Sequence, residues 1–76
     1  MSPSLPVVSG KELAAALQKK GFVLVRQTGS HLILRRGSPF AQVTVPNHKT
    51  LDRGTLRSIL RGADVSVDEL LVVLSA

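Results

Sequence analysis

The fold is decided by residues 22–46, FVLVRQTGSHLILRRGSPFAQVTVP. Runs rich in apolar and β-branched residues predict strands, and here they are residues 22–27, 31–36 and 42–45. Two turn sequences separate them, Thr28-Gly29-Ser30 and Gly37-Ser38-Pro39. Pro46 ends the third strand because proline cannot donate a hydrogen bond to a sheet ladder. Three strands joined by such short turns predict an antiparallel meander.

Side chains on the second predicted strand alternate between two faces. Leu32, Leu34 and Arg36 share one face, and the other carries His31, Ile33 and Arg35. The face with two leucines is expected to pack on the core. His31 and Arg35 are then expected on the open face, within reach of a substrate.

Helices are predicted before and after the three strands in the sequence. Ser9-Gly10-Lys11-Glu12 fits a capping box and begins a helix that Gly21 ends. Its apolar stripe contains Leu13, Ala14, Ala16 and Leu17. A second helix is predicted over 53–62, capped by Asp52 or Thr50, with Leu56, Ile59 and Leu60 facing inward.

A second capping box, Ser66-Val67-Asp68-Glu69, begins a short final helix through Leu74. The apolar residues of this helix are expected in the core or at a partner interface, namely Val67, Leu70, Leu71 and Leu74. Residues 1–8 are expected to form an extended lead-in. The complete order predicts an α+β fold of two layers, with the helices on one face of the three-stranded sheet.

The composition narrows the class of protein. A chain of 76 residues suffices for one domain, expected over 1–76, and its net charge of +5 favours an anionic partner, nucleic acid or acidic protein. The only aromatic residues are Phe22 and Phe40, which disfavours a protein that stacks single-stranded bases on aromatic platforms.

Cysteine is absent, so disulfides and thiolate metal sites are excluded. The two histidines show no His-x-x-x-His spacing, and neither a metal nor a cofactor is expected. The N-terminus lacks the pattern of a signal peptide, and no apolar run is long enough to span a bilayer. We therefore expect a soluble, cytoplasmic protein.

Several segments resemble HicA toxins in their order and spacing. They are Ser9-Gly10-Lys11-Glu12-Leu13, Gly21-Phe22, Arg26-Gln27-Thr28-Gly29-Ser30-His31, Thr44-Val45-Pro46-Asn47-His48 and Gly54-Thr55-Leu56-Arg57-Ser58-Ile59-Leu60. The similarity covers about residues 9–75. It implies a fold like that of double-stranded-RNA-binding domains, whose α-β-β-β-α order this chain shares, with a short extra C-terminal helix. It also implies ribosome-independent mRNA cleavage with His31 as the catalyst, and neutralisation by a HicB antitoxin in a toxin–antitoxin complex.

The chemistry of histidine agrees with that role. RNA is cleaved without metal when a base takes the proton from a 2′-hydroxyl, which then attacks the neighbouring phosphate. Imidazole titrates near neutral pH and suits this proton transfer. The alternative interpretation is that His31 is only an exposed histidine at the start of a strand.

Further residues are candidates for RNA contacts. Gly29 lets the backbone approach a phosphate closely, and Ser30 offers a hydroxyl and an N–H. The remaining candidates carry positive charge that suits phosphate: Lys20, Arg26, Arg35, Lys49, Arg53 and Arg57. Arg53, Arg57 and Arg61 recur every four residues and form one stripe, which is otherwise an ordinary solvated helix face. His48 is either a supporting acid or substrate contact, or an ordinary loop histidine.

Two other functions remain open. The chain is alternatively a non-catalytic module that binds double-stranded RNA, in which Gly29-Ser30-His31 has no chemical role. It is alternatively an interaction subunit whose basic face holds an acidic protein. A growth test with a His31 substitution separates the first from a ribonuclease.

Overall fold

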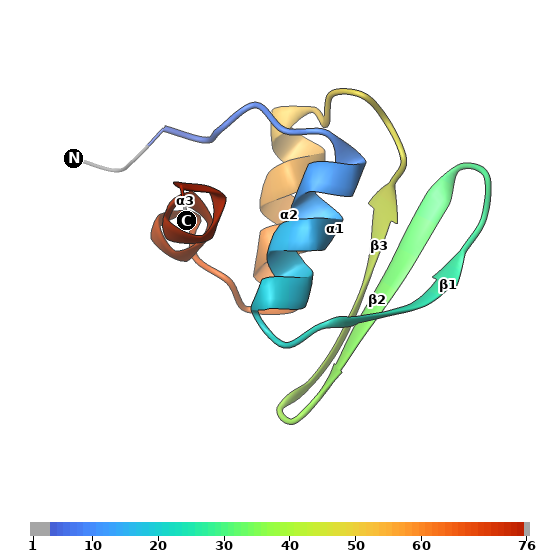
Figure 1. Cartoon of the computed structure of the whole chain (residues 1–76). Coiled ribbons are helices and arrows are strands. Elements are labelled where there is room, and N and C mark those ends of the chain that lie inside the picture. The colour runs from blue at the N-terminus through green and yellow to red at the C-terminus, as the bar shows by residue number, and fades with distance from the viewer. Residues whose placement is uncertain (1–3, 76) are drawn as a thin grey trace.

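The secondary structure follows the predicted order of helix, three strands and two helices (Figure 1). The computed structural model describes residues 4–75. The elements are α1 (Gly10–Lys19), β1 (Val23–Gln27), β2 (His31–Gly37), β3 (Phe40–Pro46), α2 (Arg53–Ala63) and α3 (Val67–Ser75). The α+β class and the extra C-terminal helix are therefore confirmed.

The three strands form one antiparallel sheet in the order β1-β2-β3. On β2, Leu34 pairs with Leu24 of β1 and Val43 of β3. Strand β3 begins two residues earlier than predicted, because Phe40 and Ala41 continue the ladder opposite the end of β2. A bulge between Leu24 and Arg26 interrupts the register of β1, which lies at the edge of the sheet.

One face of the sheet packs against the helices. Helix α1 contacts all three strands and α2 contacts β3. Leu32 and Leu34 of β2 are buried under these helices, as the alternation predicts, and His31 and Arg35 are exposed on the other face. Figure 1 shows the helices on one side of the sheet, which leaves that other face uncovered within the described part of the chain.

The helix ends are built by local hydrogen bonds that the sequence predicts. Ser9 and Glu12 form the first capping box and Ser66 and Glu69 the second. Asp52, rather than Thr50, caps α2 by accepting a hydrogen bond from the Thr55 N–H at 2.9 Å. After α1 the chain turns through Gly21 at a φ of 96°, a conformation that favours glycine.

The structure adds detail at the two ends of the chain. The part of the lead-in that is described, residues 4–8, packs on the body: Leu5 and Val8 are buried, and the Leu51 N–H donates to the Val8 carbonyl at 2.9 Å. Residues 1–3 lie outside the described residues. In α3 only Leu70 is fully buried, and Val67 and Val73 are partly buried against the core, because the main contact of this helix is with α1.

A single ion pair ties α3 to the end of α1. The Lys20 ammonium lies 2.8 Å from a carboxylate oxygen of Glu69. This contact is the main cause that lowers the pKa of Glu69 to about 2, and the hydrogen bonds from Ser66 add to it. In residues 4–75 no helix is both long and apolar enough to cross a membrane.

Candidate functional site

The turn between β1 and β2 is held together by Thr28. Its hydroxyl oxygen accepts hydrogen bonds from the N–H groups of His31 at 3.0 Å and Ser30 at 3.3 Å. The Thr28 N–H donates to the His31 carbonyl at 2.9 Å. Local bonds of this kind are typical of threonine in turns. They place His31 at the first position of β2.

The His31 ring is held by its neighbour and open to solvent. The Ser30 hydroxyl and the ring atom Nδ1 share a hydrogen bond of 2.9 Å. The side chain is exposed, so Nε2 remains available to a substrate. An imidazole held at one nitrogen and free at the other is arranged as an acid–base group.

Basic residues share the open face of the sheet with His31. Arg26 pairs with Ile33 across β1 and β2, so it lies on the same face, two residues along from His31. Arg35 is on this face as well, where its Nε donates to the side-chain oxygen of Gln42 at 2.9 Å. Gly29 has open space around it, since a Cβ atom there would meet nothing within 4 Å. This face therefore offers charge beside an accessible histidine.

The loop after β3 lies directly against the His31 turn. His31 pairs with Pro46 in the ladder, and the Asn47 N–H donates to the Ser30 carbonyl at 2.8 Å. Helix α1 reaches the same loop, because the Gly10 N–H donates to the His48 carbonyl at 2.9 Å. A side chain at position 10 would overlap the Pro46 carbonyl oxygen, so the close approach requires glycine.

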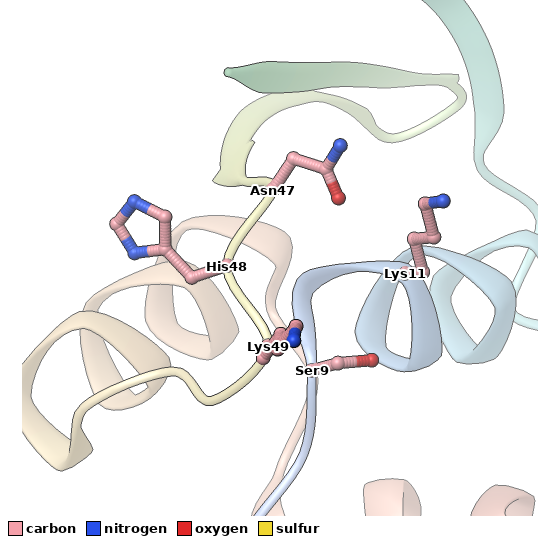
Figure 2. Close-up of a pocket in the computed structure, with 5 residues that line it drawn as sticks. All are labelled: Ser9, Lys11, Asn47, His48 and Lys49. Carbon is pink, nitrogen blue, oxygen red and sulfur yellow. The ribbon is translucent and has the colours of Figure 1, made fainter. Parts of the chain in front are cut away.

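This loop and the start of α1 enclose an open pocket of about 290 Å³ (Figure 2). Its lining residues are Ser9, Lys11, Asn47, His48 and Lys49. Figure 2 shows the His48 ring directed toward α2 and away from Lys11. The pocket brings together two segments that are far apart in sequence. Among its residues, the sequence pointed to Lys49 and His48 and missed the contribution of Lys11 and Asn47.

His48 also lies near the N-terminus of α2. The hydrogen bonds from Thr55 lower the pKa of Asp52, and the positive charge of His48 lowers it further. The two histidines therefore have different surroundings. His31 is bonded to Ser30 on the sheet, whereas His48 lies on the loop beside a helix cap.

The other residues predicted to contact RNA lie farther from the His31 turn. Arg53, Arg57 and Arg61 are exposed on α2 and begin at the end of that helix nearest the pocket loop. Lys20 lies at the far end of β1 from the His31 turn and is bonded to Glu69, so the structure does not bring it to His31. Sequence reasoning missed Thr28 as a structural support, although a threonine three residues before His31 is a signal for such a turn.

No group of three or more histidine, aspartate or glutamate side chains within residues 4–75 is placed to hold a metal ion. The chain matches the family model of the HicA toxin of bacterial toxin–antitoxin systems over residues 10–65, well over half its length. That range contains α1, the sheet, the His31 turn and α2. A comparison with curated proteins finds no match. The match over this range, together with the fold, shows that the chain belongs to the HicA toxin family.

Proposed function

We propose that this toxin is an endoribonuclease that cleaves mRNA, with His31 as its acid–base group. The observation that carries the proposal is the exposed imidazole, bonded through Nδ1 to Ser30 and lying on an uncovered basic face. Metal ions are not required by this chemistry. Cleavage of mRNA blocks translation in the cytoplasm and stops growth.

The reaction divides into proton transfers and a displacement at phosphorus. With Nδ1–H donating to Ser30, Nε2 takes the proton from a ribose 2′-hydroxyl. The 2′-oxygen attacks the adjacent phosphorus, and the bond to the 5′-oxygen breaks. The products are a 2′,3′-cyclic phosphate and a 5′-hydroxyl, whose proton comes from the imidazolium or from water. Proton transfer by a positioned group contributes about 10²- to 10⁴-fold to the rate.

Positive charge stabilises the phosphate as it gains charge in this reaction. Arg26 is a candidate for this role, because it lies on the His31 face of β1. Gly29 and Ser30 allow the RNA backbone to approach the turn. Arg35, Lys49, Arg53 and Arg57 extend the basic surface along the sheet, the loop and α2.

The partner that neutralises the toxin is a HicB-like antitoxin, and it acts by covering the His31 face. Two exposed apolar residues on this face support the idea, Val23 at 62% and Phe40 at 70% exposure. They lie beside Arg35 and near the end of the β2–β3 hairpin. A surface that combines apolar side chains with arginines fits an acidic protein partner.

The test compares His31→Ala with His48→Ala, since both histidines are exposed. Each variant is expressed from an inducible promoter, and growth and mRNA integrity are followed. Purified proteins are then incubated with RNA in the presence of EDTA. Wild type and His48→Ala should arrest growth and cleave RNA, while an equally soluble His31→Ala should do neither. Equal activity of wild type and His31→Ala would refute the assignment.

The same experiment separates ribonuclease from RNA-binding module. The exposed stripe of Arg53, Arg57 and Arg61 on α2 favours RNA binding in either case. A wild-type protein that binds duplex RNA and leaves it intact under all these conditions would support the non-catalytic alternative.

A further inference from the structure

The pocket beside the His31 turn gathers positive charge and hydrogen-bond donors. Lys11 projects from the first turn of α1, and Asn47 and Lys49 come from the loop after β3. Neither lysine takes part in an ion pair, because the single pair among residues 4–75 joins Lys20 and Glu69. Two ammonium groups and an amide are donors that suit the oxygens of a phosphodiester.

The Glu12 carboxylate borders this pocket and is engaged in the capping box of α1. Glu12 accepts a hydrogen bond from the Ser9 N–H at 2.8 Å. Its side chain lines a separate depression between α1 and α3, together with Val73 and Leu74. The pocket lining itself contains no acidic residue. Lys11 and Lys49 therefore give the lining a net positive charge.

The pocket is coupled to the His31 turn by backbone contacts. Asn47 follows the residue that pairs with His31, and its N–H donates to the Ser30 carbonyl at 2.8 Å. Paired Cα atoms lie about 4.5–5.5 Å apart and successive Cα atoms about 3.8 Å. The Cα atoms of His31 and Asn47 are thus within about 10 Å. An RNA strand with one phosphate at His31 has another within that span.

Close packing holds the two halves of the pocket together. The Gly10 N–H binds the His48 carbonyl, and the absence of a side chain at Gly10 lets α1 lie against Pro46. Figure 2 shows Lys11 and Asn47 projecting on the same side, from α1 and from the loop. Their relative position is set by the fold before any ligand arrives.

We propose that Lys11, Asn47 and Lys49 form a subsite that binds a second phosphate of the RNA strand, next to the one at His31. This subsite rests on the proposed ribonuclease function and gives it a binding register. In this register the RNA strand crosses from the open face of the sheet to the start of α1. The subsite positions RNA and takes no part in the proton transfers.

The test measures RNA affinity as a function of salt. All variants carry His31→Ala, so that a single-stranded RNA oligonucleotide stays intact during fluorescence-anisotropy titrations. Lys11→Met and Lys49→Met each remove one ammonium from the pocket. Lys19→Met is the matched control, an exposed lysine at the opposite end of α1. Each lost phosphate contact lowers the slope of log affinity against log salt by about 0.7 for single strands.

We expect a smaller slope for Lys11→Met and Lys49→Met and an unchanged slope for Lys19→Met. Equal slopes in all variants, or the same decrease in Lys19→Met, would overturn the subsite. The wild-type protein is assayed for RNA cleavage in parallel. If the wild type cleaves RNA and all variants have equal slopes, only the subsite proposal is refuted. If the wild type neither binds nor cleaves RNA, the proposed function is refuted as well.

Discussion

Substituting alanine for Gly10 tests how closely α1 packs on the loop beside His31. The added Cβ would overlap the carbonyl oxygen of Pro46 and press on the Asn47 backbone. Backbone atoms cannot swing away as a flexible side chain does, so the helix must move back from the loop. That movement breaks the 2.9 Å hydrogen bond from the Gly10 N–H to the His48 carbonyl.

Two unfavourable contributions and one favourable contribution set the change in the free energy of unfolding of Gly10→Ala. The lost hydrogen bond costs about 0.5–1.5 kcal/mol, and forcing an extra carbon into a packed contact costs about 1–3 kcal/mol. Alanine offsets up to about 1 kcal/mol through its helix propensity. The net destabilisation by Gly10→Ala is about 2 kcal/mol. For a domain of this size it lowers the Tm by about 8–16 °C.

Gly54→Ala is the matched control, because it also places an alanine in the first turn of a helix. A Cβ at Gly54 would meet nothing within 4 Å. There the change should be neutral or stabilise by up to about 1 kcal/mol. Both variants are compared with wild type by thermal and urea unfolding. A Gly10→Ala protein with the same Tm as Gly54→Ala would refute the close approach of α1 to Pro46.

Three further predictions concern the His31 turn and the α1–α3 contact. Ser30→Ala removes the bond to Nδ1, worth about 1 kcal/mol, and should lower kcat for RNA cleavage roughly 3- to 10-fold at unchanged KM; a kcat equal to wild type argues against orientation by Ser30. Thr28→Val keeps the shape and removes the hydroxyl that accepts from two N–H groups, so kcat should fall about 10-fold while the Tm changes by only a few degrees; an unchanged kcat contradicts the support role. The folded-state pKa of Glu69, about 2, lies below its ordinary value of 4.5, so its stabilising effect is present above about pH 4.5 and is lost as the pH falls toward 2. Glu69→Gln should therefore melt below wild type at neutral pH, and the two melting curves should converge near pH 2; a constant difference across that range rules out the ion pair with Lys20 as the cause.

Local physical chemistry explains what the sequence by itself determined. Both capping boxes and the turn at Gly21 depend on neighbours within a few residues, and they occur where the sequence predicts them. The alternation along β2 depends on the pleat of a single strand. It correctly assigned Leu32 and Leu34 to the core and His31 to the open face.

Contacts between distant segments decided the remainder. The length of β3 depends on its pairing with β2, and the burial of Leu5 and Val8 depends on the helices they meet. The exposure of α3 follows from its position, where its main packing partner is α1. Periodicity within a segment carries no information about which neighbour covers it, so the sequence did not predict these features.

The candidate site divides in the same way. The sequence determined that His31 follows a turn on an open, basic strand face, because turn chemistry and strand alternation act locally. Only the tertiary structure decided that Lys11 lines one pocket with Asn47 and Lys49, and that Lys20 is paired with Glu69 instead of lying near His31. The physical reason is that α1 can approach Pro46 only where Gly10 leaves room, and this fit exists only in the packed fold.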